Sequence, residues 1–267
     1  MKKLFVILLA IAMLLCISSC GNTNYAGDGK DGESESNFGA DSETQALNYP
    51  FCPYTYEIKE EIIVIHETDD GRKSTKVLRY PQIGGMDDAV LMENVNSIFR
   101  EVAEKQFKQN VPDVDIYIIE DTVFNYEVSE VEITLLSNSL ISVKNTVYTM
   151  SSNSAYPSCP VYTVNIDLIK GEIIEEDDII SDFNIISSAF LAGDFKMVSG
   201  AEGLLDNTNY EDMILQYKSD YASYPEVYFT PDSLGICIDL VSALGSNACF
   251  EIAIDDIADA LIINPTK

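Results

Sequence analysis

The chain has 267 residues, of which 44 are acidic and 16 basic, and 46% are hydrophobic. That hydrophobic content excludes a disordered acidic tail, because disorder requires low hydrophobicity together with high charge. A formal net charge of −28 repels phosphate backbones and therefore argues against nucleic acid as a partner. The chain has one histidine, His66, so a histidine-rich metal centre is excluded, and we expect no cofactor.

The N-terminus has the features of an export signal. Two lysines precede an apolar run over residues 4–17, which as a helix would span about 21 Å, short of a hydrocarbon core of about 30 Å. Residues 17–20 are similar to a bacterial lipobox, in which the cysteine is lipidated and becomes the first residue after cleavage. We therefore predict a lipoprotein signal peptide over residues 1–19 and a lipid on Cys20. The alternative is an ordinary signal peptide in which this cysteine is incidental.

The lipid would hold the chain on the outer face of the bacterial cytoplasmic membrane, at the cell surface. Residues 20–46 follow as a flexible acidic tether, since they contain five glycines, six acids and almost no branched aliphatic side chains. Residues 47–267 then carry 38 acidic and 13 basic side chains, a net charge of about −25. The acidity thus belongs to the folded part, which favours cationic or neutral partners.

Hydrophobic periodicity divides the folded part into strands and helices. Residues 54–67 and 74–80 are strand-like and flank a turn at 69–71. Residues 87–109 repeat apolar side chains every three or four positions, as an amphipathic helix does. β-rich segments follow in chain order at residues 116–119, 123–128, 131–136, 140–150 and 161–168.

The second half of the folded part mixes helical and strand-like patterns. Helical patterns lie at about 184–198, 209–219 and 255–261, and strand-like segments at 227–230, 234–241 and 248–254 separate the last two helices. Strands that are adjacent in sequence and joined by short turns pair in the antiparallel direction. The pattern predicts an α+β fold of antiparallel sheets with packed helices.

Four cysteines remain beyond the signal and the lipidation site. An even number in an exported domain permits two disulfides. Cys237 and Cys249 both fall on the wetter face of neighbouring strand-like segments at a hairpin-like spacing, so we predict that they pair. Cys52 and Cys159 would then pair by elimination. The alternative is four free thiols.

The sequence contains no recognisable catalytic constellation. His66 lies in a strand-like segment, and no serine occupies a Gly-x-Ser-x-Gly elbow. With 44 acids, any chosen carboxylate pair is uninformative without geometry. The acids between residues 172 and 178 are interpreted as caps of a short turn rather than calcium ligands. We therefore predict no catalytic, cofactor-binding or metal-binding residues, and a protein that is not an enzyme.

Tyrosines form a candidate ligand surface. Tyr148, Tyr156 and Tyr162 bracket two prolines, and Tyr221 and Tyr224 belong to a run of four tyrosines within twelve residues. A ring with a polar tip suits contact with a peptide or a glycan. Half-buried packing between strands and loops is the alternative interpretation.

The order of several segments resembles an extracytoplasmic region that is shared by RsiV-like anti-sigma factors and the N-terminal module of PdaC-like peptidoglycan deacetylases. The segments are residues 139–148, 155–157, 162–171, 178–180, 228–238 and 250–254. This resemblance implies two small α+β subdomains in one compact unit, which we place at residues 47–153 and 154–267. In the RsiV-like members, the region binds lysozyme. Tyr156 stands where the family often has a histidine, so no binding residue is carried over to it.

The resemblance and the composition together favour a non-catalytic, surface-anchored binding lipoprotein. We expect neither a sigma-binding segment before the apolar run nor a deacetylase domain after Lys267, and anti-sigma activity is not predicted. Candidate partners are a cationic, lysozyme-like protein or peptidoglycan. The alternatives are a carboxylate-dependent enzyme of cell-wall glycan, which requires carboxyl groups converging in a cleft, and a structural envelope lipoprotein, which requires a large exposed apolar patch.

Overall fold

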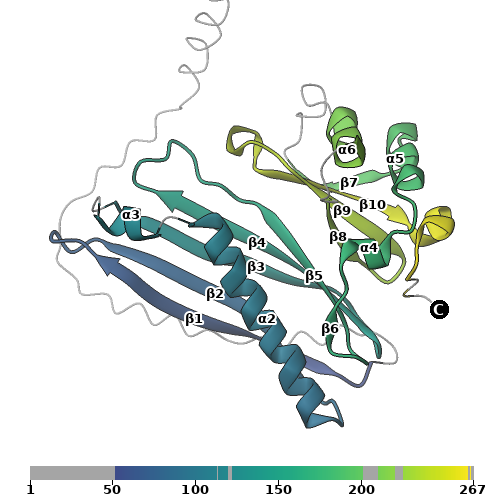
Figure 1. The fold of residues 1–267 in the computed structure, drawn as a ribbon, viewed down its shortest axis with the longest axis horizontal. Helices are drawn as coiled ribbons and strands as arrows, with labels where there is room; N and C mark the ends of the chain where they lie inside the picture. The colour runs from purple at the N-terminus through teal and green to yellow at the C-terminus, as the bar shows by residue number, and fades with distance from the viewer. Residues whose placement is uncertain are drawn as a thin grey trace, which may run out of the picture. The chain divides into compact units, whose positions relative to one another are not determined.

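The structure is a computed structural model, and it describes residues 52–112, 114–119, 122–200, 210–219, 225–263 and 265. All of them belong to one unit of the chain, Ser42–Lys267. The predicted signal peptide, Cys20 and the predicted tether lie outside the described residues. Within the described part, two β-sheets with packed helices confirm the α+β fold class (Figure 1).

The first sheet has six strands in sequence order, from β1 to β6. Neighbouring strands are antiparallel except β2 and β3, which run parallel because helix α2 connects them as a crossover. The element bounds are β1 (Thr55–Glu67), β2 (Lys73–Gly84), α2 (Ala89–Asn110), α3 (Val114–Ile119), β3 (Phe124–Leu136), β4 (Leu140–Ser151), β5 (Val161–Asp167) and β6 (Glu172–Ile173).

Helix α2 covers one face of this sheet, as Figure 1 shows. Asp88 caps its N-terminus, where the side-chain oxygen accepts hydrogen bonds from the backbone N–H groups of Val90 and Leu91 at 2.9 and 3.0 Å. The apolar side of the helix is buried or partly buried and packs against side chains from β2 to β5. The buried helical residues are Val95, Phe99, Ala103, Gln106 and Phe107. This packing places the C-terminal half of α2 beside β5.

Three local predictions in the sequence were wrong. Residues 116–119, predicted as a strand, belong to the short helix α3, because packing of Tyr117 against Phe124 (ring centroids 5.3 Å apart) outweighs local β-propensity. Residues 123–128 and 131–136 form one strand, β3, with register shifts instead of two strands. The helix predicted over 184–198 ends at Ala192, because Gly193 adopts a left-handed conformation that caps it.

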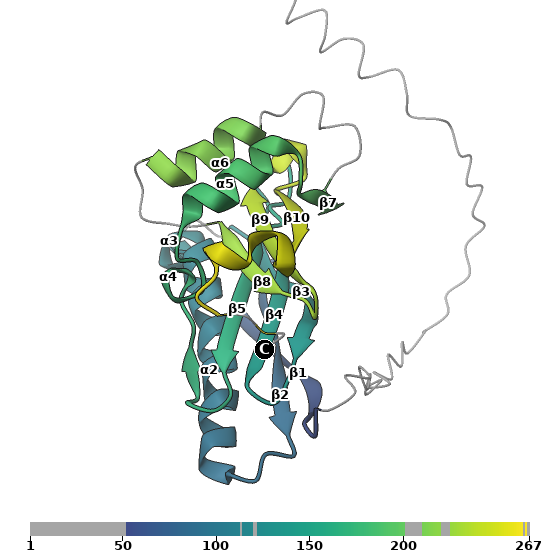
Figure 2. The same cartoon turned by 90° about the vertical axis from the view of Figure 1, so that its right-hand side faces the viewer.

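The second sheet is antiparallel, and its strand order is β7-β10-β9-β8. Helices α5 and α6 lie side by side against it (Figure 2). The bounds are α4 (Glu176–Ile179), α5 (Phe183–Ala192), β7 (Lys196–Ser199), α6 (Tyr210–Ser219), β8 (Glu226–Phe229), β9 (Ser233–Asp239), η1 (Ser242–Leu244), β10 (Asn247–Ala253) and η2 (Ile254–Ala260).

Side chains of the first sheet bind the backbone of β8 and join the two sheets. The hydroxyl oxygen of Ser142 accepts a hydrogen bond from the Phe229 N–H at 2.9 Å, and the Asn165 amide donates to the Val227 carbonyl at 2.8 Å. The first sheet also continues past residue 153, since β5 pairs with β4 and β6 pairs with β5. The division into residues 47–153 and 154–267 stays a prediction.

Candidate functional site

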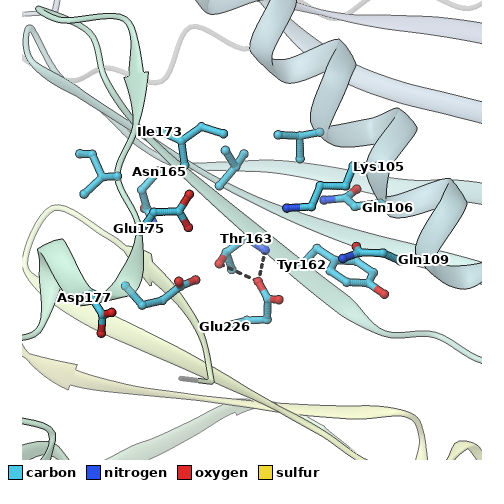
Figure 3. Close-up of a pocket in the computed structure, with 14 residues that line it drawn as sticks. Lys105, Gln106, Gln109, Tyr162, Thr163, Asn165, Ile173, Glu175, Asp177 and Glu226 are labelled. Carbon is cyan, nitrogen blue, oxygen red and sulfur yellow. Dashed lines mark hydrogen bonds between the residues drawn. The ribbon is translucent and has the colours of Figure 1, made fainter. Parts of the chain in front are cut away.

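A pocket of about 560 Å³ lies where α2, β5, the β6–α4 segment and β8 meet (Figure 3). Its volume is in the range of small-molecule sites, about 300–1,000 Å³. The lining residues are Val102, Lys105, Gln106, Gln109, Tyr162, Thr163, Val164, Asn165, Ile173, Ile174, Glu175, Glu176, Asp177 and Glu226. They come from segments far apart in the sequence, so only the folded chain assembles this site.

The free edge of β5 forms one wall of the pocket. On one side, β5 pairs with β4 along its whole length, but on the other it pairs with β6 only at Ile166 and Asp167. The N-terminal part of the strand therefore has backbone groups without a neighbouring strand. Glu226 of β8 occupies part of this edge. Its Oε2 accepts hydrogen bonds from the Thr163 backbone N–H at 2.6 Å and from the Thr163 hydroxyl at 2.9 Å.

Glu226 is the most strongly perturbed acid of the pocket. Burial, with smaller contributions from the nearby carboxyl groups of Glu176 and Asp239, raises the pKa of its carboxyl to about 7. The two hydrogen bonds from Thr163 act in the opposite direction and are the weaker influence. A carboxyl group with a pKa of about 7 changes its charge near neutral pH, so its state responds to whatever occupies the pocket.

The segment after β6 adds further carboxyl groups to the pocket. Burial raises the pKa of Glu176, and the neighbouring Glu175 and Asp177 also raise it, whereas the positive charge of Lys105 lowers it. Lys105 is an exposed residue of α2, and in Figure 3 its side chain extends over the pocket toward the acidic side. Of the acids predicted as caps of a short turn, Glu175 is the N-cap of α4 but makes no side-chain hydrogen bond there, and Glu176, Asp177 and Asp178 form its first turn. Glu175, Glu176 and Asp177 also line the pocket.

Two buried amide side chains in the pocket wall have an oxygen without a hydrogen-bond partner. They are Oε1 of Gln106 and Oδ1 of Asn165, and each residue is only 3% exposed. The Asn165 NH₂ group donates to the Val227 carbonyl, which fixes the orientation of its amide. Buried polar atoms are nearly always paired. Both residues line the pocket, and their oxygens have no hydrogen-bond partner in the protein although the atoms themselves are almost fully covered.

The structure brings one of the predicted tyrosines to the pocket. Tyr162 lines it, and its hydroxyl oxygen accepts a hydrogen bond from the Asn110 amide at 2.8 Å. Tyr148 is half-buried on β4, and Tyr156 is 63% exposed; neither is a lining residue. Tyr221 and Tyr224 lie outside the described residues.

The cysteines are divided between one disulfide and two thiols. Cys237 and Cys249 are directly opposite each other on β9 and β10 and are joined by a disulfide. The face they share is not the wetter one, because both are buried against Val161 and Tyr228. Cys52 and Cys159 are free thiols, so the second predicted pairing is not formed.

The two free thiols lie in different parts of the fold, each beside a different partner. Cys52 lies 3.6 Å from the Ser137 carbonyl oxygen, whereas the backbone N–H of Cys159 donates to the Ser246 hydroxyl at 2.8 Å. Burial raises the pKa of both thiols. A raised pKa leaves less of the reactive thiolate at neutral pH, so neither thiol has the character of a nucleophile.

Neither a metal cluster nor a membrane-spanning helix is found among the residues that the structure describes. Among them, no group of three or more His, Cys, Asp or Glu side chains is arranged to hold a metal ion. No helix in the same residues is both long and apolar enough to cross a membrane.

Comparison with solved structures identifies the fold class. A crystal structure of a DUF3298 family member from Bacteroides fragilis matches with a TM-score of 0.53 at 14% identity, over 80% of this chain and 96% of that one. A DUF3298 family protein from Pseudomonas aeruginosa PAO1 matches with a TM-score of 0.46 at 9% identity, over 81% and 96%. No family model and no curated protein matches the sequence. The first likeness shows that the chain has the fold of that DUF3298 structure.

Proposed function

We propose that this chain is a non-catalytic binding module, held on the outer face of the bacterial cytoplasmic membrane by a lipid on Cys20, and that the pocket beside Glu226 takes its ligand. The observation that carries the proposal is a pair of buried amide side chains, Gln106 and Asn165, which line the pocket and whose oxygens have no hydrogen-bond partner. A wall meant only for packing would be more stable with apolar side chains at these positions, because an unsatisfied buried polar group costs about 1–3 kcal/mol.

The proposed partners are a cationic, lysozyme-like protein or peptidoglycan. The folded part of the chain carries a net charge of about −25, which attracts a basic protein over several ångströms beyond contact. The resemblance to RsiV-like proteins supports the same kind of partner. Peptidoglycan offers an alternative ligand with both hydroxyl and amino groups that can donate to the pocket oxygens.

Retention of lysozyme and of insoluble peptidoglycan tests this function. The full chain in detergent is incubated with each, at about 0.05 M and about 0.5 M salt, where the screening length falls from about 14 Å to about 4 Å. We expect retention that weakens with salt and that Glu226→Gln reduces. Glu172→Gln is the matched control, because Glu172 is an exposed glutamate of β6 that does not line the pocket. No retention of either partner, or equal retention by both variants, would contradict the proposal.

A second candidate is a carboxylate-dependent enzyme acting on cell-wall glycan. The specific observation in its favour is Glu226, whose pKa of about 7 suits a general acid near neutral pH, with Glu176 as a second carboxyl in the same pocket. Release of reducing sugar ends from peptidoglycan, lost in Glu226→Gln and kept in Glu172→Gln, would establish this candidate. Retention of peptidoglycan without any release would favour the binding module.

A further inference from the structure

We propose that the pocket binds a compact organic cation, a primary ammonium or a guanidinium group. We also propose that the Lys105 ammonium group competes with this cation for the carboxyl groups of the pocket. This inference rests on the proposed function, because it assigns a ligand class to the same pocket.

The unpartnered hydrogen-bonding atoms of the pocket favour a ligand that donates hydrogen bonds. The two unpartnered atoms, Gln106 Oε1 and Asn165 Oδ1, are both acceptors. One N–H of the Asn165 amide donates to the Val227 carbonyl, and the backbone N–H and hydroxyl of Thr163 both donate to Glu226. Ammonium and guanidinium groups carry donors and no acceptors. They therefore match the two free oxygens better than a carboxylate or a phosphate does.

The charges around the pocket select a cation. Glu175, Glu176, Asp177 and Glu226 line it, and Lys105 is the basic residue among the lining side chains. Burial and the neighbouring carboxyl groups raise the pKa of Glu226 and of Glu176, so the negative form of each is disfavoured. A cation among them stabilises the negative form and forms charge-assisted hydrogen bonds, which are about twice as strong as neutral ones.

The size and the walls of the pocket favour a small group on an apolar stem. A volume of about 560 Å³ holds a single side chain or a small amine but no folded protein. Val102, Val164, Ile173 and Ile174 line the pocket together with the polar groups. An alkyl chain can pack against these aliphatic side chains while its charged end reaches the acids, as long basic side chains commonly do.

The ammonium group of Lys105 already supplies a positive charge to the pocket. Its side chain extends over the pocket (Figure 3), and its charge acts on Glu176. A ligand cation would have to share or displace this charge, so removal of Lys105 should strengthen cation binding. An anionic ligand would depend on Lys105, and its binding should weaken in the same variant. The direction of the change therefore distinguishes the two ligand classes.

Calorimetric titration of the full chain in detergent tests the inference with defined probes. The probes are n-butylamine and methylguanidine at neutral pH, with n-butanol as a neutral and acetate as an anionic comparison. We expect the two cations to bind and the others not to bind. Lys105→Gln should tighten cation binding about five-fold, and Glu226→Gln should weaken it about ten-fold, as expected for one charge at a partly buried site. Lys108→Gln is the matched control, since Lys108 is exposed on the same helix outside the pocket lining.

The results of the titration and of the retention assay distinguish the cation-binding inference from the proposed binding function. Failure of both cations to bind the wild type and the Lys105→Gln variant would overturn the inference, and so would acetate binding that disappears in Lys105→Gln. Tightening by Lys108→Gln to the same extent would overturn the role of Lys105. If the cations fail while lysozyme or peptidoglycan retention still depends on Glu226, the inference fails and the proposed function stands. Cation binding without retention of either partner supports the inference and removes the proposed partners.

Discussion

Replacement of Glu226 by glutamine should make the folded chain more stable, and increasingly so as the pH rises. The glutamine keeps the size of the side chain, and its oxygen can still accept the hydrogen bonds from Thr163. The substitution removes the ability to ionise and replaces the second carboxyl oxygen by an NH₂ group. Because burial and the carboxyl groups of Glu176 and Asp239 disfavour the charged form, the wild-type chain carries a cost that the variant lacks.

The sign and size of the effect follow from proton linkage. The pKa of Glu226 is about 7 in the folded chain against an ordinary value of 4.5. Below pH 4.5, both the folded and the unfolded chain hold the proton, and no cost arises. Between pH 4.5 and 7, the unfolded chain loses its proton first, so stability falls as the pH rises, and above pH 7 the full cost persists. The cost is about 1 kcal/mol at pH 5 and about 3 kcal/mol at pH 8.

Urea unfolding followed by far-ultraviolet circular dichroism at pH 5, 6, 7 and 8 measures this difference. The gain in unfolding free energy of Glu226→Gln over the wild type should grow by about 2 kcal/mol from pH 5 to pH 8. Glu172→Gln makes the same chemical change at an exposed position and should show no such growth. A gain for Glu226→Gln that stays constant within about 0.5 kcal/mol over this range would refute the account of a desolvated carboxyl group.

Three further predictions concern the scaffold and the anchor. Gly235→Ala should cost about 2–3 kcal/mol and lower the melting temperature by several degrees, because a Cβ at this position would lie 2.1 Å from the Tyr228 ring. Replacement of Cys237 and Cys249 by alanine should cost about 3 kcal/mol in urea unfolding, since their disulfide closes a short loop; equal stability would contradict this. Cys20→Ala should release the protein or leave an unprocessed precursor, and unchanged membrane retention with a normally cleaved N-terminus would contradict the predicted lipid on Cys20.

Local patterns were sufficient to predict the fold class and the main elements. The apolar spacing over 87–109 predicted α2 almost to its ends, which the structure places at Ala89–Asn110, because one face of this helix is buried from Val95 to Phe107. The same reasoning did not yield the parallel pairing of β2 and β3. That pairing depends on the path of the crossover helix, which sequence periodicity does not contain.

The candidate site could be predicted only in part. Tyr162 was identified by its aromatic ring, but Gln106, Asn165 and Glu226 were not singled out. Each of these residues gains its character from a partner far away in the sequence, as Glu226 does from Thr163, which lies 63 positions earlier. One local signal was available, since Glu226 begins the short strand β8, whose other residues are buried and hydrophobic. An acid in such a strand is uncommon unless it has a partner.

The carboxyl group of Glu226 differs from the many exposed carboxylates of this acidic chain. In a protein with 44 acids, exposed carboxylates keep the chain soluble. Many of its basic side chains pair with such carboxylates, as Arg79 does with Glu60 and Glu127. Glu226 is different, because it is held in a pocket beside other carboxyl groups at a cost of about 3 kcal/mol near pH 8. A cation in the pocket would offset that cost, so the destabilising carboxyl group becomes a source of affinity. The expected signature is a ligand that stabilises the wild type more than Glu226→Gln, by a margin that grows from pH 5 to pH 8.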